Sequence, residues 1–230
     1  MLHSSSFMPP IKSFPWHQGA TLNTLLTVNT SATTSPTQNQ TLRLFSFAGA
    51  TSGEWKVLSI KTLIGDPLPS VTHLTIAPPA IPPTGSTVLW TLRGITSNER
   101  YVTRSEKEQL LNRQPPTGRS EATHAALIPI RKTDDWWRLP QDERRRIFEE
   151  QSHHIEIGLL FLPAIARRLH HCRDLSPHEP FDFLTWFEFA PSDASAFDDL
   201  IDKLRATSEW NFVSREIEIR LERNQTSALS

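Results

Sequence analysis

Cysteine is almost absent: the 230-residue chain contains one, Cys172, so it cannot form an internal disulfide. Nothing in the sequence therefore requires an oxidising compartment. No apolar run reaches the roughly 18 residues that a membrane-spanning helix needs. An excess of charge is missing too, because 24 Lys and Arg face 25 Asp and Glu. Without an overall charge to attract the chain to nucleic acid or to an anionic membrane, we expect neither as a partner.

Glycine is scarce, with 8 residues against 18 prolines, and the motifs that place glycine around phosphates are missing. Neither GxGxxG nor GxxxxGKS/T occurs, which argues against a nucleotide-driven enzyme. The zinc spacings CxxC and HExxH and the GxSxG nucleophile elbow are absent as well. The aromatic residues include 12 Phe and 7 Trp but a single tyrosine, Tyr101, so chemistry that needs a tyrosine depends on that position.

Residues 1–41 contain no carboxylate and one Lys or Arg, Lys12, and they are rich in Ser, Thr, Asn and Pro. Such a composition buries too little apolar surface to order itself, so we expect a disordered extension. The segment lacks the basic start and unbroken apolar stretch of a secretory signal, and it lacks the arginines of an organelle transit peptide. We therefore expect a cytoplasmic protein, with the periplasm as the alternative location.

Residues 42–124 are filled by short β-like runs separated by Pro and Gly, which we interpret as an N-terminal module. A helix that begins with Ser105 as its cap is expected near the end of this module. The expected strands cover residues 42–47, 55–63, 71–76 and 87–92, and the expected helix covers residues 105–112.

Residues 125–223 form a second module with a clearer pattern. Pro129 lies in the first expected strand and marks an edge or a bulge there. The sequence predicts strands at 125–130, 181–190 and 212–221, and helices from 140 to 163, from 164 to about 171, and from 194 to 207. Strands with helices on one side predict an α+β architecture of two ferredoxin-like modules, followed by a disordered tail at 224–230.

Four histidines and a cysteine gather within residues 153–173 and suggest a zinc site. Because the histidines come as adjacent pairs rather than three or four residues apart, a closed tetrahedral site is hard to assemble. We instead interpret His170, His171 and Arg173 as cations at a helix C-terminus. The arginine run at 144–146 is interpreted as a solvated helix face.

His154 and Arg167 stand apart because both can point inward. A neutral imidazole can ligate iron through one ring nitrogen when a carboxylate takes the other N–H. Glu209, beside Trp210 at the end of the last expected helix, could be that carboxylate. The residues alone equally allow a histidine that is only hydrogen-bonded in a core.

Three segments make the chain recognisable: KTDDWWRLPQDERRRIFEEQSHHIEIGLLFLPAIARRLHHCRDL, EPFDFLTWFEFAP and LRATSEWNFVSREIEIRL. Together they closely resemble the chlorite dismutase family and, within it, the short, dimeric lineage. The resemblance extends over residues 42–223 and is strongest from residue 125 onward. It implies a homodimer of haem b proteins in which each subunit has two ferredoxin-like modules, and the C-terminal module holds the haem.

By this resemblance, His154 matches the axial haem ligand and metal-binding residue, Glu209 the carboxylate that hydrogen-bonds it, and Arg167 the mobile distal arginine of chlorite-degrading members. Thirteen residues of one straight helix would separate His154 and Arg167 by about 20 Å, too far to flank one iron. A break at Pro163 is therefore expected.

The resemblance also supplies the remaining candidates for cofactor binding. Thr185 and Phe187 match the wall of the distal pocket. Trp136, Lys132 and Tyr101 match residues around the haem edge and its propionates.

The resemblance implies that ferric haem takes one oxygen atom from chlorite, giving a ferryl species and hypochlorite, which recombine to chloride and dioxygen. Both atoms of the dioxygen then come from chlorite. Arg167 suits this reaction because its guanidinium is permanently cationic and can retain anionic hypochlorite in an apolar pocket.

Coproheme decarboxylase, in the same superfamily, is an alternative whose members use a redox-active tyrosine and lack the distal arginine. Ile128 stands where that tyrosine is expected, and Arg167 is present. A weak haem peroxidase and a non-catalytic haem-binding or sensing dimer are further alternatives.

Overall fold

The computed structural model of the chain describes residues 43–77, 86–96 and 100–224. All described residues belong to one compact unit. The disordered extension expected at 1–41 lies outside the described residues, as does the tail expected at 224–230 apart from Asn224, whose N–H donates to the Glu54 carbonyl over 2.9 Å.

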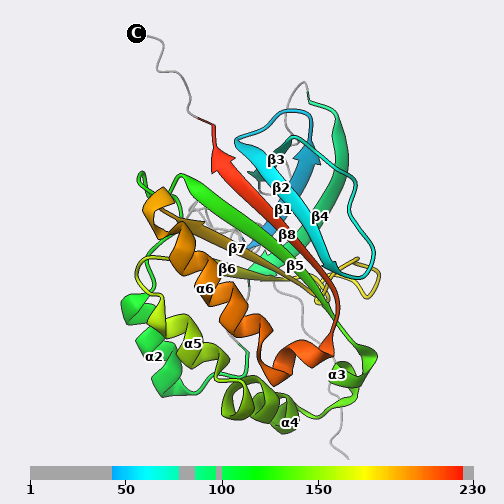
Figure 1. The fold of residues 1–230 in the computed structure, drawn as a ribbon. Helices are drawn as coiled ribbons and strands as arrows, with labels where there is room; N and C mark the ends of the chain where they lie inside the picture. Colours follow the sequence, from blue (N-terminus) through cyan, green and yellow to red (C-terminus); the bar gives the residue numbers. More distant parts are fainter. Residues whose placement is uncertain (1–42, 78–85, 97–99, 225–230) are drawn as a thin grey trace, which may run out of the picture. The chain divides into compact units, whose positions relative to one another are not determined.

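The described strands close into one antiparallel barrel (Figure 1). They are β1 (Leu44–Ala50), β2 (Trp55–Ile64), β3 (His73–Ala77), β4 (Val88–Thr96), β5 (His124–Lys132), β6 (Ala166–His171), β7 (Phe183–Phe189) and β8 (Val213–Arg223). The order around the barrel is β1-β3-β2-β8-β5-β7-β6-β4. Strands β1–β4 are therefore contiguous, as are β5–β8, and the pairs β2–β8 and β4–β6 join the two sets.

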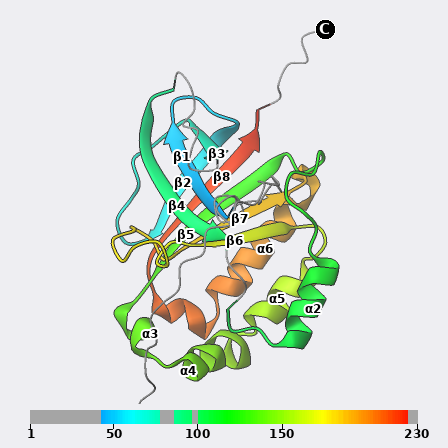
Figure 2. The same cartoon turned by 180° about the vertical axis from the view of Figure 1, so that it is seen from behind.

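The longer helices gather on the side of the barrel formed by β5–β8, as both views show (Figures 1 and 2). The helical segments are α2 (Arg104–Arg113), α3 (Asp134–Arg138), α4 (Gln141–Arg145), the π-helix η1 (Arg146–Gln151), α5 (His154–Leu160), the 3-10 turn η2 (Pro191–Asp193), α6 (Ala194–Arg205) and the 3-10 turn η3 (Ser208–Phe212). This arrangement confirms the predicted α+β ferredoxin-like class. No helix within the described ranges is long and apolar enough to cross a membrane.

Strand alternation divides the core into two layers. Leu184 and Trp186 of β7 belong to the cluster that fills the barrel. Phe187 and Phe189 belong to a second cluster, together with Phe197 of α6. The alternating pattern of β7 thus points one face of the strand into the barrel and the other toward the helices.

The predicted helix at 164–171 is wrong, because these residues form strand β6. The pairs run from Ala166↔Glu188 to His171↔Phe183 along β7. The spacing of Ile165 and Leu169 imitates a helix face, but the ladder with β7 satisfies the backbone of this segment and overrides that pattern. His170 and His171 consequently lie on opposite faces of a strand rather than at a helix C-terminus.

Three smaller predictions also need correction. Thr103, not Ser105, caps α2, because its side chain accepts from the N–H of Glu106, whose carboxylate accepts from the Thr103 N–H. The expected helix from 140 to 163 is interrupted near His153, which has a left-handed φ of 51°. Pro129 pairs with Leu184 inside the closed barrel and marks no edge.

The arginine run is a solvated face only in part, because Arg146 is exposed whereas Arg144 and Arg145 are half-buried. Arg145 forms an ion pair with Glu106 of α2, with Nη2 2.7 Å from Oε1. Arg144 donates to the Leu139 carbonyl over 2.9 Å and to the Tyr101 hydroxyl over 3.2 Å. These contacts tie α4 to the segment that precedes α2.

His170 is fully buried inside the barrel, with its ring 5.0 Å from that of Phe45 and 5.1 Å from that of Phe47. Its Nδ1 lies 3.1 Å from the Thr96 hydroxyl, and Arg168 Nε donates to its Nε2 over 3.2 Å. Because Nε2 accepts, the neutral ring carries its proton on Nδ1. Burial and, to a smaller extent, the positive charge of Arg168 together lower the pKa of His170 to about 3.

We expect the free energy of unfolding to decrease as the pH falls below 6.5, the ordinary pKa of the imidazole. In the window down to about 3 the unfolded chain binds a proton at His170 that the folded chain does not, which costs about 1.4 kcal/mol per pH unit. His171, with a pKa lowered to about 4 by burial, acts in the same direction. His170→Gln should flatten this slope in urea unfolding measured between about pH 7.5 and 4.5. Equal slopes for both proteins would contradict the prediction.

Candidate functional site

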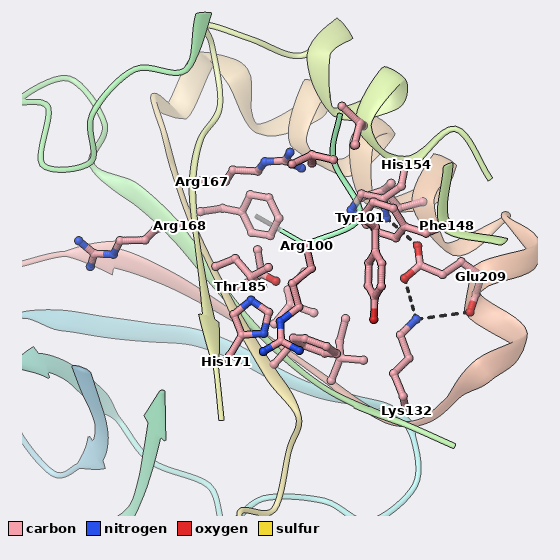
Figure 3. A pocket seen from close by; sticks show the side chains of 18 of the residues that line it. Arg100, Tyr101, Lys132, Phe148, His154, Arg167, Arg168, His171, Thr185 and Glu209 are labelled. Carbon is pink, nitrogen blue, oxygen red and sulfur yellow. Dashed lines mark hydrogen bonds and ion pairs between the residues drawn. The ribbon is translucent and has the colours of Figure 1, made fainter. Parts of the chain in front are cut away.

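A cavity of about 240 Å³ lies between the helix-facing side of β5–β7 and the helical segments α2, α5, α6 and η3. Its lining is mostly apolar, with a few polar and charged side chains (Figure 3). All residues that the sequence singles out as site candidates line this one cavity: Tyr101, Lys132, Trp136, His154, Arg167, Thr185, Phe187 and Glu209.

His154 is the first residue of α5 and follows directly on the left-handed His153. Its Nδ1 lies 2.7 Å from Oε2 of Glu209. The Phe148 ring from η1 stacks on the imidazole, with centroids 4.3 Å apart and planes inclined by 24°. The carboxylate and the stacked ring fix the orientation of the imidazole, and Nε2 is the ring nitrogen that such an arrangement offers to a ligand.

Glu209 in η3 is buried, yet it is an ionised carboxylate. Burial alone would raise its pKa, but the positive charges of His154 and Lys132, and the hydrogen bonds that both donate, lower the pKa to about 2. The Lys132 ammonium lies 2.7 Å from Oε1 and is itself only 4% exposed. His154, Glu209 and Lys132 thus form a continuous chain of contacts, drawn as dashed lines in Figure 3.

The backbone around Glu209 is held as firmly as its side chain. The Glu209 N–H donates to the Ser152 hydroxyl over 3.0 Å, and that hydroxyl lies 3.0 Å from the hydroxyl of Ser208. The Trp210 indole N–H donates to Glu216 of β8 over 2.8 Å. The turn that carries Glu209 is therefore attached both to the residues before α5 and to the barrel.

Arg167 enters the cavity from β6, where it pairs with Phe187 of β7. Its backbone carbonyl accepts a hydrogen bond from Gln114 Nε2 over 2.6 Å. Helix α5 ends at Leu160 and β6 begins at Ala166, so the chain reverses around Pro163, as the spacing required. This reversal brings Arg167 and His154 to the same cavity although they are not on one helix.

Thr185 lines the cavity beside Phe187 on the helix-facing side of β7. Its partner in the register of β5 is Ile128, which also lines the cavity. On this wall the Thr185 hydroxyl therefore lies among the apolar side chains of Phe187 and Ile128.

Lys132 also lines the cavity, and its ammonium is buried against Glu209, 4.7 Å from the ring centroid of Trp136 and 5.7 Å from that of Trp210. Tyr101, with a left-handed φ of 63°, has its ring edge-on to Trp136 at 6.2 Å. Lys132 and Tyr101 are therefore both neighbours of Trp136. Their place around a haem edge and its propionates stays a prediction.

Sequence reasoning missed several lining residues. Arg100 precedes Tyr101 and forms an ion pair with Asp174. His171 is 2% exposed and lines the cavity, and its Nε2 has no hydrogen-bond partner among the described residues. His171 lies two residues from Leu169 and four from Arg167, which also line the cavity from β6. A correct strand assignment for β6 would therefore have identified His171.

Three comparisons place these features among known proteins. Residues 85–223 match the family profile described as chlorite dismutase. The chlorite dismutase of Ideonella dechloratans is 33% identical over 131 residues, which cover 54% of this chain and 41% of that protein. The match therefore spans about two fifths of the length of that curated relative.

Solved structures show the same similarity. A dimeric chlorite dismutase from Nitrobacter winogradskyi is 53% identical, with a TM-score of 0.72, and the match covers 78% of this chain and 99% of that one. The chlorite dismutase of Candidatus Nitrospira defluvii in complex with imidazole shares the fold, with a TM-score of 0.57 at 18% identity over 82% of this chain and 95% of that one.

The fold and the cavity define an α+β barrel protein with a buried histidine–carboxylate pair in the wall of an apolar pocket. The family profile covers more than half of the chain, and the Nitrobacter structure is matched over nearly its whole length. The chain belongs to the chlorite dismutase family.

Removal of the lysine tests whether the buried contact chain stabilises the fold. Lys132→Met leaves Glu209 with His154 as its one remaining charged partner, so we expect the free energy of unfolding to decrease by about 3–5 kcal/mol at neutral pH. The double variant with Glu209→Gln should recover much of this loss, because no carboxylate is then left unpaired. Urea unfolding monitored by tryptophan fluorescence measures both effects.

Arg138→Ala is the matched control, since its ion pair with Asp135 is exposed, at 76% and 77% for the two side chains. We expect no measurable change in unfolding for this variant. A loss after Lys132→Met as small as that of the control would contradict a stabilising role for the buried pair.

Proposed function

We propose that the chain is a haem b enzyme that decomposes chlorite to chloride and dioxygen. The observation that carries this proposal is the pairing of His154 Nδ1 with ionised Glu209, in a cavity that Arg167 enters from β6. A histidine oriented by a carboxylate suits a ligated iron, and a permanent cation in an apolar cavity suits an anionic substrate. Family membership supports chlorite as that substrate.

The residues present fit a haem. One imidazole nitrogen is committed to a carboxylate, which is the donor arrangement of a metal-bound histidine. The walls supply apolar side chains from three elements, including Ile128, Leu169 and Ile201. Two buried donors that line the cavity, Trp136 Nε1 and His171 Nε2, have no hydrogen-bond partner among the described residues. Unpaired polar atoms in an apolar cavity are expected where a ligand with its own polar groups completes the site.

When bound, haem supplies the redox chemistry that cleaves chlorine–oxygen bonds and joins the two oxygen atoms of chlorite. The protein's own contribution is electrostatic. Glu209 holds a proton on Nδ1 of His154 and directs the other nitrogen to the metal. Lys132 keeps Glu209 ionised, because its ammonium lowers the pKa of the carboxyl.

Arg167 holds the anions. The substrate chlorite and the product chloride are anions, and hypochlorite, which would form on the way from one to the other, is an anion once deprotonated. An apolar cavity contains little water to solvate these anions. A guanidinium stays protonated under all working conditions, so its attraction does not depend on pH. Retention of hypochlorite allows both oxygen atoms of one chlorite to leave as one dioxygen molecule.

The decarboxylase alternative is less well supported. Ile128, where that enzyme's tyrosine is expected, lines the cavity and has no oxidisable hydroxyl. The single tyrosine, Tyr101, also lines the cavity, but its hydroxyl accepts a hydrogen bond from Arg144 Nη1 over 3.2 Å. A peroxidase or a non-catalytic haem-binding dimer would share the same fold, and the experiment below separates them from a chlorite-degrading enzyme.

We propose a homodimer as the working form, because the Nitrobacter relative, 53% identical, is described as dimeric. Sedimentation equilibrium of the purified protein should give twice the chain mass of 26.2 kDa. A monomer or a pentamer would contradict this assignment.

Dioxygen release is the first test of activity. Protein loaded with haemin should release close to one dioxygen per chlorite added, measured with an oxygen electrode. A protein with a normal Soret band that releases no dioxygen would exclude chlorite decomposition and leave the peroxidase and the haem-binding alternatives.

Arg167→Ala tests the retention of the anion. We expect haem uptake to remain, while kcat/KM for chlorite falls by about tenfold or more, as for the loss of other preorganised electrostatic contacts. Hypochlorite that escapes should raise the yield of a chlorination trap and inactivate the enzyme after fewer turnovers. Unchanged oxygen yield and unchanged inactivation would refute the assigned role.

A further inference from the structure

Glu216 is a buried carboxylate of β8 that lies outside the cavity lining but contacts a residue inside it. Its Oε2 accepts the indole N–H of Trp210 over 2.8 Å, and Trp210 lines the cavity. Its Oε1 accepts from Nε and Nη2 of Arg205 over 2.8 Å and 2.6 Å. The two oxygens of this carboxylate therefore have different partners, one in helix α6 and one in the wall of the site.

The neutralisation of Arg205 does not by itself explain why Glu216 is buried here. Glu218, two residues further along β8, also accepts from Arg205 Nη2, over 2.7 Å, and its side chain is only 4% exposed. Two carboxylates thus share one guanidinium, although burial of a charged group costs free energy. Among the described residues, the contact that Glu216 makes and Glu218 does not is the one with Trp210.

The ring that Glu216 holds lies over the buried ammonium of Lys132. Lys132 Nζ is 5.7 Å from the ring centroid of Trp210 and 4.7 Å from that of Trp136, within the range of a cation–π interaction. Both rings line the cavity next to the ion pair of Lys132 with Glu209, so they limit the access of water to it. The indole N–H of Trp136 has no hydrogen-bond partner among the described residues, whereas that of Trp210 is bonded from outside the cavity.

The hydrogen bond from the indole fixes the orientation of this ring. Trp210 belongs to the short turn η3, and its side chain has two torsion angles that the backbone alone does not set. Hydrogen bonds to a charged acceptor are roughly twice as strong as those between neutral groups. An amide at position 216 would have one acceptor oxygen for the donors of both Arg205 and Trp210, so it could satisfy only one of them.

We propose that Glu216 is a positioning residue for the buried chain of contacts in the site. Through the indole N–H it holds the ring of Trp210 over Lys132. The ring keeps water from the ion pair of Lys132 with Glu209, so the carboxylate has no water molecule as an alternative partner to His154. The effect on a bound haem rests on the proposed function, whereas the effect on water at Lys132 does not.

Hydrogen exchange with water measures this protection directly. NMR of the isotope-labelled chain without added haemin reports the exchange rates of the Trp210 indole N–H and of the Lys132 ammonium. For Glu216→Gln we expect both rates to rise by about tenfold or more, because the ring is no longer held and water reaches the lysine. The two signals are assigned by their loss in Trp210→Phe and in Lys132→Met.

Glu218→Gln is the matched control. It removes the same charge from the same strand and weakens the same pairing with Arg205, but Glu218 does not touch Trp210. Both exchange rates should stay as in the unmodified chain. Equal acceleration in the two variants would indicate a general loosening around Arg205 and would overturn the proposal, as would an unchanged rate at Lys132 in Glu216→Gln.

Trp210→Phe tests the same hydrogen bond from its other side and leaves β8 unchanged. Phenylalanine keeps an aromatic ring but has no N–H, so the exchange at Lys132 should accelerate as it does in Glu216→Gln. If Glu216 acts through the indole, Glu216→Gln in the Trp210→Phe background should add nothing. A further acceleration of similar size would mean that Glu216 acts by another route, which is incompatible with the proposal.

Loss of haemin from the loaded protein tests the consequence for His154. Glu216→Gln should release haemin several-fold faster than Glu218→Gln, because a hydrated ion pair holds the histidine less firmly. Transfer to an excess of apomyoglobin measures the rate, and equal release by the two variants would overturn the link to His154. If the unmodified chain takes up no haemin, the proposed function fails, while the exchange rates still decide whether Glu216 holds Trp210 over the lysine.

Discussion

The ionised carboxylate of Glu209 is buried, and the arrangement of the site follows from the need to satisfy it. An unpaired buried charge would cost several kcal/mol, so its partners must be supplied from separate parts of the chain. Lys132 comes from the end of β5, His154 from the start of α5, and Ser152 from the residues between η1 and α5. These contacts fix the positions of all three residues. The start of α5 is fixed with them, and the chain reversal that leads into β6 follows this helix.

The strand character of β6 then distributes the charges of the cavity. Residues of a strand alternate between its faces, so Arg167 and His171 reach the cavity. His170 turns into the barrel, where it packs against aromatic rings and stays neutral. In a helix, the adjacent basic residues of this segment would point in different directions around the helix surface. A single arginine would then not face the cavity wall that contains Thr185.

The sequence predicts those parts of the fold in which one periodicity dominates. The strict alternation of Phe183–Phe189 and the helical spacing of Ala194–Arg205 both specify elements that the structure contains. The helix prediction for Ala166–His171 is wrong because the apolar spacing of this segment fits a helix. Its pairing partner, β7, lies beyond a loop, and no local sequence pattern indicates that pairing. The contact between Lys132 and Glu209 was not predicted for a related reason: the charge of Lys132 is visible in the sequence, but its contact with Glu209 depends on how two distant segments meet.

Besides Arg167, the cavity is lined by the cationic side chains of Arg100, Lys132 and Arg168. Lys132 and Glu209 neutralise each other, and Arg168 donates to His170 inside the barrel. Arg100 is compensated by its ion pair with Asp174. The buried pair therefore orients the histidine without adding net charge to the cavity. Under the proposed function, the attraction for an anion is then left to Arg167 of β6, whose guanidinium stays cationic at all working pH values.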